Sequence, residues 1–281
     1  MYNSEKGEMH MFGAIIGDTV GSIYEFDNIK TKDFPLYAPD CQPTDDSYMT
    51  IAVANACMEY DGDLTAFREI LIDEMHRLGD RYPYSGYGNH FMCWLLNKQR
   101  TPYNSCGNGS AMRASPCGWM CDTLEETLAL AEASADVTHN HPEGIKGAQA
   151  IAAAIFLART GSSREQIRAY ISETFGYNLN RTCDEIRPVY GWGALCQDTV
   201  PEALVAFFDS VDFEDAIRNA VSLGGDCDTL TCITGSVAEA HYGVSNKQRR
   251  AALCIMRRYM HSDELESVER FHREYVRRRG W

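Results

Sequence analysis

The chain has 281 residues, 44% of them hydrophobic, and its formal net charge is −14. This length is enough to bury a large apolar core, in one domain or two. The strong acidic balance argues against non-specific binding to nucleic acid, because the phosphate backbone would be repelled. It also suggests that bound cations offset part of the negative charge.

Eleven cysteines are scattered along the chain, many within apolar helical segments, and no CxxC pair occurs. We therefore expect reduced and mostly buried thiols rather than a disulfide scaffold. Residues 1–12 lack the apolar core of a signal peptide, and no run of eighteen apolar residues is present. These features predict a protein without membrane contact, and we expect a cytoplasmic location.

Near the N-terminus, Gly13, Gly17 and Gly21 are spaced four residues apart. On a helix this spacing lines the glycines up on one face and leaves a groove, in which a second helix packs closely. Such packing explains the glycines but not Asp18 or Glu25. Position alone favours the surface for Glu25, although it is also a candidate acid near a metal site.

Helical periodicity dominates the rest of the chain, and strand-like alternation is nearly absent. The sequences Thr123-Leu-Glu-Glu126 and Ser163-Arg-Glu-Gln166 are capping boxes that predict helix starts. Further helices are predicted at 51–60, 63–78, 147–159, 201–208, 212–223, 229–242, 246–260 and 262–279. The sequence thus predicts an all-α fold, a compact single domain over residues 1–281 in which interhelical loops carry the chemistry.

Two pairs of aspartates stand at the starts of apolar helices, about 180 residues apart. One is Asp45-Asp46, preceded by Thr44, and the other is Asp226-Cys-Asp228, followed by Thr229. Helix N-termini accept carboxylates as caps, so capping alone is the simpler alternative. Burying several carboxylates together is costly unless cations neutralise them, and Mg²⁺ or Mn²⁺ prefers such oxygen ligands. We therefore predict that the two segments are halves of one metal site.

Three other loops carry polar or aromatic groups. The segment from Ser105 to Arg113 is rich in glycine, and its backbone N–H groups and Arg113 could bind phosphate, although taken alone the segment favours an ordinary turn. Residues 138–144 contain His139 and His141, which we expect to form hydrogen bonds at a helix junction rather than bind metal. The aromatic loop 82–88 either stacks a base or sugar or covers the core.

Together these segments resemble the ADP-ribosylglycohydrolase family. The matching pieces are Gly17-Asp18, Gly21 and Glu25, Thr44-Asp45-Asp46, the segment from Gly107 to Arg113, Thr138-His139, and the segment from Gly225 to Thr229. They occur in the family's order and cover nearly the whole chain. Ser47 replaces a common threonine and keeps its hydroxyl, while Cys227 fills a variable position.

The resemblance implies an all-α fold with two Mg²⁺ or Mn²⁺ ions in a cleft. It implies as metal ligands Thr44, Asp45, Asp46, Asp226, Asp228 and Thr229. It implies as catalytic residues Glu25, Asp46 and Asp228, with Glu25 serving as ligand, gate or acid–base group. Substrate contacts would come from Gly86, Tyr87, Ser105, Gly107, Asn108, Gly109, Ser110, Arg113 and His139.

The activity implied is hydrolysis of the glycosidic bond between ADP-ribose and an acceptor, with an arginine side chain of a protein as the preferred acceptor. The partners would be an ADP-ribosylated protein or small molecule, with ADP-ribose as product; an ADP-ribosylated nucleic-acid end remains open. Two alternatives also remain. One is a dimetal phosphohydrolase that cleaves a nucleotide diphosphate, and the other is a non-catalytic ADP-ribose binder.

Overall fold

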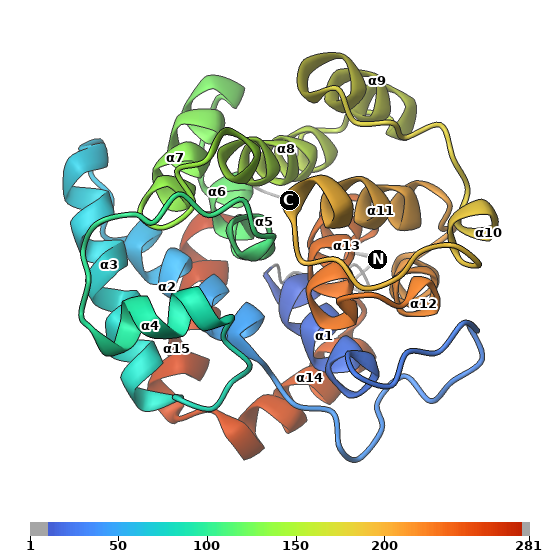
Figure 1. Cartoon of the computed structure of the whole chain (residues 1–281), viewed down its shortest axis with the longest axis horizontal. Coiled ribbons are helices and arrows are strands. Elements are labelled where there is room, and N and C mark those ends of the chain that lie inside the picture. Colours follow the sequence, from blue (N-terminus) through green and yellow to red (C-terminus); the bar gives the residue numbers. More distant parts are fainter. Residues whose placement is uncertain (1–10, 277–281) are drawn as a thin grey trace, which may run out of the picture.

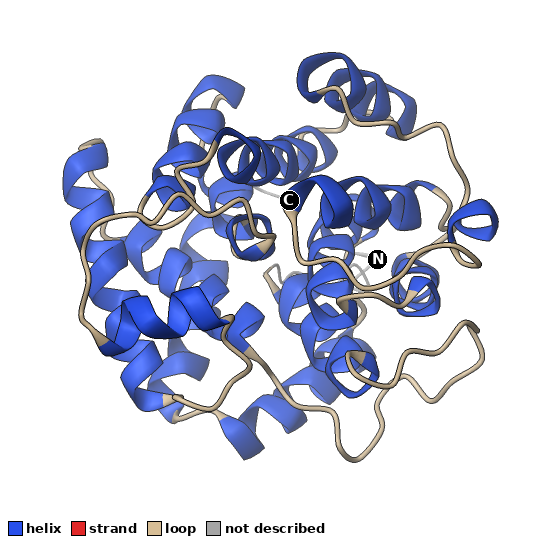
Figure 2. Cartoon of the chain, in the orientation of Figure 1, coloured by secondary structure: helices blue, strands red, loops and turns tan. Residues whose placement is uncertain are grey.

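The computed structural model describes residues 11–276, and in this part of the chain the regular elements are helices (Figure 2). The one extended pairing among these residues is an isolated antiparallel bridge between Gly107 and Leu195. The prediction of an all-α fold is therefore confirmed. Within the same residues, no helix is both long enough and apolar enough to cross a membrane.

The helices follow one another through short and medium loops (Figure 1). In chain order they are α1 (Phe12–Gly21), the 3₁₀ turn Ser22–Tyr24, α2 (Asp45–Met58), α3 (Leu64–Arg81), α4 (Asn89–Leu96), α5 (Gly109–Met112), α6 (Ser115–Met120), α7 (Leu124–Asp136), α8 (Pro142–Arg159), α9 (Arg164–Phe175), α10 (Cys183–Ile186), α11 (Cys196–Phe208), α12 (Phe213–Leu223), α13 (Cys227–Tyr242), α14 (Asn246–Tyr259), α15 (Ser262–Phe271) and the π-helical turn His272–Val276.

Helix α13 lies at the centre of the core and is buried from Cys227 to Glu239. It contacts α1, α8, α11 and α12, which surround it with apolar side chains (Figure 1). A helix that is buried on all sides needs such a setting, because it offers no face to water. The functional residues at the start of α13 are therefore fixed by the most deeply packed helix of the fold.

The spaced glycines form the contact between α1 and α13. A Cβ atom on Gly13 would lie 2.2 Å from the carbonyl oxygen of Gly235, and one on Gly17 would lie 2.1 Å from that of Thr231. At Gly21 the Cβ would meet the Cα of Asp228 at 2.6 Å. These distances confirm the prediction of a close helix contact, and they place the end of α1 beside the start of α13.

Both predicted capping boxes are present, at the starts of α7 and α9. Most predicted helix positions are confirmed, with ends shifted by a few residues; α2, α8 and α11 begin six, five and five residues before their predicted starts at 51, 147 and 201. The short helices α4, α5, α6 and α10 were not predicted. The expected extension of the last helix beyond residue 276, and the analysis of residues 1–10, fall outside the described residues.

All eleven cysteines are free thiols, as expected. Cys93 on α4 and Cys254 on α14 depart from the expectation of mostly buried thiols, because both side chains are exposed. An amphipathic helix leaves some of its apolar positions at the edge of the buried stripe. The remaining cysteines are buried or half-buried.

We expect Gly17→Ala to lower the free energy of unfolding by about 3 kcal/mol or more, because the new methyl group would meet backbone that cannot move aside. Urea denaturation measures the loss. Gly191→Ala is the matched control, since a Cβ there meets no atom within 4 Å, and it should change stability by less than about 1 kcal/mol. Equal stability of both variants would show that α1 and α13 separate at little cost.

Candidate active site

The two predicted halves of the metal site meet where α2 and α13 begin. Thr44 caps α2 and accepts a hydrogen bond from the backbone N–H of Asp46, and Asp45 and Asp46 occupy the first turn. Asp226 is the N-cap residue of α13, and Asp228 lies in its first turn. Thr229 links the two helices by donating its hydroxyl to Asp46 Oδ2 at 3.3 Å. Both helix dipoles therefore point their positive ends at one group of acids.

Capping does not account for all of these acids. Asp226 stands at the N-cap position of α13, but its side chain makes no capping hydrogen bond. Its Oδ2 instead accepts a hydrogen bond from the side-chain amide of Asn108 at 2.7 Å. The simpler alternative, in which the second acid pair only caps its helix, therefore fails at Asp226.

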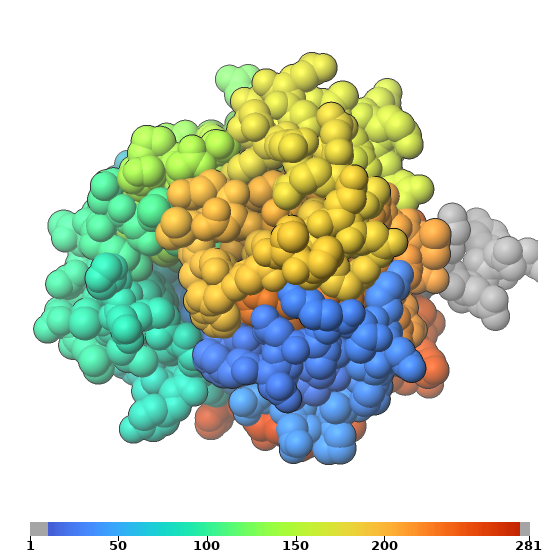
Figure 3. Space-filling model, turned by 45° about the vertical axis from the view of Figure 1, so that its right-hand side comes forward, coloured from blue at the N-terminus to red at the C-terminus, as the bar shows by residue number. Residues whose placement is uncertain are grey.

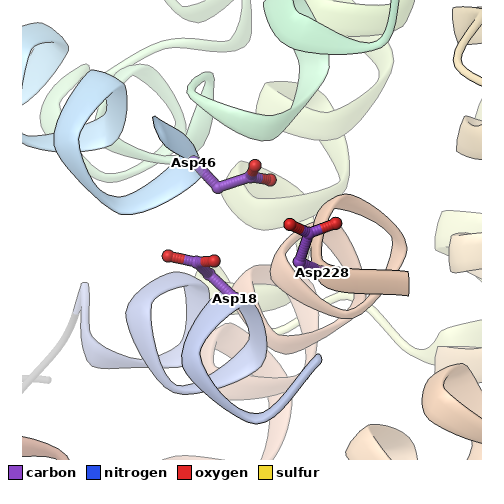
Figure 4. Close-up of side chains that lie close together, drawn as sticks. All are labelled: Asp18, Asp46 and Asp228. Carbon is purple, nitrogen blue, oxygen red and sulfur yellow. The ribbon is translucent and has the colours of Figure 1, made fainter. Parts of the chain in front are cut away.

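Asp18, at the end of α1, is a third member of the site that the sequence reasoning left unassigned. Its carboxylate lies within 4.8 Å of those of Asp46 and Asp228 (Figure 4). It accepts hydrogen bonds from the backbone N–H and hydroxyl of Thr44, at 2.9 and 2.6 Å, and from the same two groups of Ser47. Asp18 thus binds the N-terminus of α2 to α1. The sequence feature that could have indicated this role is an acid directly after a glycine of the helix-packing series.

Glu25, Asp226 and Asp228 form a second cluster of carboxylates within 4.8 Å, and Asp228 belongs to both clusters. Glu25 is half-buried and lines the cleft, so the interpretation of Glu25 as a plain surface residue is wrong. Asn28 fixes this region, because its amide donates to the carbonyls of Glu25 and Gly225, both at 3.0 Å, and its Oδ1 accepts from the N–H of Gly225.

Crowding and burial change the acidity of every carboxylate here. Burial raises the pKa of Asp18 to about 6, although the hydrogen bonds from Ser47 and Thr44 act in the opposite direction. Burial, together with the charges of Asp226 and Asp18, raises the pKa of Glu25 to about 7. Burial and the neighbouring aspartates also raise the pKa of Asp45, Asp46 and Asp228 well above the ordinary value. The site holds more negative charge than the protein alone stabilises.

The donor set suits a hard cation. All candidate ligand atoms are carboxylate or hydroxyl oxygens, the kind that Mg²⁺ and Mn²⁺ prefer. Asp46 Oδ1 is buried and has no hydrogen-bond partner in the described part of the chain. A buried carboxylate oxygen without a partner is costly, and a cation would remove that cost. The residues present therefore fit a divalent metal ion.

A cleft of about 660 Å³ opens from the carboxylates towards the glycine-rich loop. Gly86 forms part of its wall beside Asp45, with φ of +97°, a conformation that favours glycine. The predicted site residues that line the cleft are Glu25, Asp45, Asp46, Gly86, Ser105, Gly107, Asn108, Gly109, Arg113, His139, Asp226, Asp228 and Thr229. The fold thus brings most of the predicted site residues to one cavity.

Two backbone N–H groups of the glycine-rich loop donate hydrogen bonds to other groups of the protein. The N–H of Gly107 donates to Ser105 Oγ at 3.1 Å, and that of Asn108 donates to the carbonyl of Ala194 at 2.9 Å. The side-chain amide of Asn108 also donates hydrogen bonds to Thr199 Oγ1 and Asp226 Oδ2. The loop therefore positions the second acid pair as well as forming a wall of the cleft, a role that its sequence did not indicate.

Two predicted substrate-contact residues have buried side chains that lie outside the cleft lining. Ser110 is fully buried and donates its hydroxyl to the carbonyl of Gly144 at 2.7 Å. Tyr87 is 7% exposed and packs against Phe91. Tyr82 stacks on Tyr48 of α2. Tyr82 and Tyr87, both in the aromatic loop, therefore cover the core rather than present a stacking surface. Substrate contacts by Ser110 and Tyr87 stay predictions, which this geometry does not favour.

The histidine segment forms a helix junction, as expected. His141 caps α8 by accepting a hydrogen bond from the N–H of Glu143 at 3.1 Å. His139 is 5% exposed, contacts Thr138 Oγ1 through Nδ1 at 2.8 Å, and lines the cleft. Neither histidine belongs to the carboxylate clusters among the described residues.

Two exposed aromatic rings stand at the rim of the cleft. Phe26 is 87% exposed and Trp192 is 58% exposed, and their rings stack with centroids 5.8 Å apart. Phe26 directly follows Glu25, and Trp192 lines both the cleft and an adjoining groove of about 710 Å³. The segments that carry them lie side by side on one face (Figure 3), where Lys30 donates to the carbonyl of Tyr190 at 2.8 Å.

An all-α fold with two carboxylate clusters that could hold metal ions beside a cleft is suited to a metal-dependent hydrolase, and comparison with known proteins identifies the family. The sequence model of the ADP-ribosylglycohydrolase family matches residues 5–278. The chain therefore belongs to the ADP-ribosylglycohydrolase family, and it is an enzyme, an ADP-ribosyl hydrolase.

Individual relatives agree with this assignment. The chain is 27% identical to the ADP-ribosylarginine hydrolase Tri1 of Serratia proteamaculans over 275 residues, which cover 86% of this chain and 73% of the relative. It is 26% identical to the human ADP-ribosylhydrolase ARH3 over 310 aligned positions, which cover 83% and 84% of the two chains. A solved ADP-ribosylglycohydrolase-related protein complex matches with a TM-score of 0.65 at 21% identity, covering 93% of this chain and 95% of that one, and so shares the fold.

In the presence of the chelator EDTA, we expect the free energy of unfolding of the protein to fall as the pH rises from about 4 to about 7. The pKa values of Asp18 and Glu25, about 6 and about 7, lie above the ordinary values of 3.8 and 4.5, so the folded state binds more protons in this interval. Their contribution is full below the ordinary pKa and is lost as the pH passes the folded-state pKa. Urea denaturation in EDTA at several pH values measures the slope.

Added Mg²⁺ or Mn²⁺ should restore stability at the upper end of this pH range, because bound cations stabilise the ionised carboxylates. The control is Asp228→Asn, in which the fall in EDTA should be shallower because one of the coupled carboxylates is missing. A flat profile for the wild-type chain in EDTA would contradict the crowding of charge described above.

Proposed function

We propose that this enzyme uses two divalent cations to release ADP-ribose from ADP-ribosylated arginine side chains of proteins. The observation that supports the metal count is that Asp228 belongs to both carboxylate clusters, Asp18–Asp46–Asp228 and Glu25–Asp226–Asp228. One acid placed between two clusters suits a bridging ligand between two ions. Asp228 would bridge the ions, and the remaining ligands would be Thr44, Asp45, Asp46, Asp226 and Thr229.

The bound ions would orient the hydroxyls of the distal ribose and lower the pKa of a water molecule. The chain's own residues supply the remaining steps. Glu25 lies beside Asp226 and Asp228 at the wall of the cleft, where its carboxylate is placed to take and return a proton. Asn108 holds Asp226 in place through the hydrogen bond at 2.7 Å. Glu25 would accept the proton of the attacking water as the glycosidic bond breaks.

Two observations favour arginine as the acceptor. A relative with 27% identity is named as an ADP-ribosylarginine hydrolase. The rim of the cleft, where Phe26 and Trp192 stand beside Glu25, also suits a guanidinium group, which binds to aromatic faces and is attracted by carboxylates. A serine acceptor would gain nothing from these rings.

Incubation with ADP-ribosyl-arginine and ADP-ribosyl-serine peptides, in Mg²⁺, Mn²⁺ or EDTA, tests the proposal directly. We expect metal-dependent release of intact ADP-ribose, fastest from the arginine peptide. Asp228→Asn should lower kcat by about 10²-fold or more and weaken metal binding, because a shared ligand of both ions is lost. Liquid chromatography of the products and calorimetric titration of the metal measure both effects.

The control for this variant is Asp27→Asn, which removes an exposed aspartate near Glu25 that does not line the cleft. It should keep wild-type activity. Release of AMP in place of ADP-ribose would favour the phosphohydrolase instead. Binding of ADP-ribose without any turnover would favour a binding role, and full activity of Asp228→Asn would contradict the metal assignment.

Trp192→Ala should lower kcat/KM for the arginine peptide about 3- to 30-fold, the range expected when a cation–π contact of about 0.5–2 kcal/mol is lost. The serine peptide should be affected less than about twofold. Trp192→Phe keeps an aromatic face and should retain most of the activity, and Val189→Ala, in the adjoining groove, serves as a second control. An equal loss of kcat/KM for both peptides would show that Trp192 does not distinguish arginine from serine acceptors.

A further inference from the structure

Three buried polar residues form a continuous chain beneath the wall of the cleft. Arg113 is 1% exposed, Thr138 is fully buried and His139 is 5% exposed. Arg113 Nη2 lies 2.8 Å from Thr138 Oγ1, which lies 2.8 Å from His139 Nδ1. Buried polar groups at hydrogen-bonding distance pair a donor with an acceptor at each link. The positions of the hydrogen atoms along these two links can therefore be worked out from the chemistry of the groups.

The charged guanidinium of Arg113 forms hydrogen bonds at the C-terminus of α7. Its Nη2 also donates to the carbonyls of Ser134 and Ala135, at 2.8 and 3.5 Å, in the last turn of α7. The C-terminus of a helix carries negative partial charge, which offsets part of the cost of burying a guanidinium. Arg113 is thus anchored to α7, and it presents an N–H group to Thr138 from a fixed position.

The direction of each hydrogen bond follows from the chemistry of the groups. A guanidinium has donors only, so Thr138 Oγ1 accepts from Arg113. The hydroxyl has one hydrogen of its own, and His139 Nδ1 is the acceptor within reach. Burial and the charge of Arg113 lower the pKa of His139 well below 6.5, so the ring is neutral and carries a single proton. If Nδ1 accepts, that proton is on Nε2.

The Nε2 atom faces the glycine-rich loop of the cleft. A Cβ atom on Gly109 would lie 3.1 Å from Nε2, and one on Gly107 would lie 3.5 Å from it. Because both residues are glycines, the ring edge is left accessible to a ligand in the cleft that it lines. The N–H group at Nε2 is therefore available in the cleft beside the glycine-rich loop.

We propose that Thr138 is a positioning residue that fixes His139 as an Nε2–H donor to an oxygen of the substrate's diphosphate. The identity of this ligand rests on the proposed function, whereas the position of the proton does not. If the proton were on Nδ1, the lone pair of Nε2 would face the phosphate oxygens and repel them. The hydroxyl of Thr138 thus affects substrate affinity without touching the substrate.

Two variants at position 138 separate this role from simple packing. Thr138→Ser keeps the hydroxyl, and Thr138→Val keeps the shape and removes it. Thr127→Val is the control, because it also removes a buried threonine hydroxyl. Thr127 lies on α7, and its hydroxyl donates to the carbonyl of Thr123 at 2.8 Å. Thr127→Val should lower stability less than Thr138→Val, which also removes a partner of Arg113 and of His139, and Thr127 is absent from the cleft lining.

Nitrogen-15 NMR of histidine-labelled protein reports the protonated ring nitrogen, and His139→Gln identifies the signal. We expect the Nε2–H form in the wild-type chain, in Thr138→Ser and in Thr127→Val. In Thr138→Val the signal should shift to the Nδ1–H form or to a mixture. A wild-type chain with the Nδ1–H form, or an unchanged signal in Thr138→Val, would overturn the inference. This measurement needs neither substrate nor turnover.

Calorimetric titration with ADP-ribose in Mg²⁺ measures the effect on binding. Thr138→Val should weaken binding about 10- to 100-fold, the range for a lost hydrogen bond to a charged group. Thr138→Ser should stay within about twofold of the wild type, and Thr127→Val should bind normally. In the turnover assay Thr138→Val should raise KM and change kcat less.

A changed ring signal in Thr138→Val with unchanged ADP-ribose affinity would overturn the role in binding. If Thr138→Val does not fold, Thr138→Ala takes its place, and the wild-type ring signal still decides the direction of the hydrogen bonds. Failure of the proposed function is seen separately, as a wild-type chain that neither binds nor releases ADP-ribose while its His139 signal is of the Nε2–H form.

Discussion

The close contact between α1 and α13 is the constraint on which the site depends. Gly17 and Gly21 let the two backbones approach so closely that a methyl group would not fit between them. This contact places Asp18, at the end of one helix, beside Asp228, at the start of the other. At the far end of the same pair, Glu239 of α13 accepts hydrogen bonds from the backbone N–H groups of residues 11–13 and so caps α1. The helix pair is thus fixed at both ends by buried carboxylates.

These buried acids differ in how they are stabilised. Glu239 and Asp18 accept three and four hydrogen bonds from the protein, which offset part of the cost of burying each carboxylate, although burial still raises both pKa values. Asp46 instead has an oxygen without a partner among the described residues, and Asp228 stands between two clusters. Hydrogen bonds fix the framework, and the less compensated acids carry the affinity for cations. Without this division, a metal ion would compete with the bonds that hold α2 in place.

The sequence predicted the fold class and most helices because those rest on local signals, and it predicted the meeting of the two acid pairs because several buried carboxylates need cations to neutralise them. Capping boxes at Thr123 and Ser163 are local patterns, and so is the periodicity of the long helices. Helices of four to eight residues, such as α4 and α5, are too short to show a period. The role of Asp18 was missed because its partners, Thr44 and Ser47, are 26 and 29 residues away. The bond between Asn108 and Asp226, 118 residues apart, left no sequence signal.

The cleft is lined by groups of opposite chemical character, and this difference favours one orientation of the proposed substrate. Carboxylates gather at the starts of α2 and α13, whereas Arg113 and His139 line the cleft beside the glycine-rich loop. A diphosphate would be repelled by any carboxylate that a cation does not neutralise, and it would gain hydrogen bonds beside the glycine-rich loop. A ribose diol has no charge to be repelled and provides oxygens that bound cations accept. The distal ribose would therefore lie against the acids, with its anomeric carbon near Glu25 and the aromatic rim.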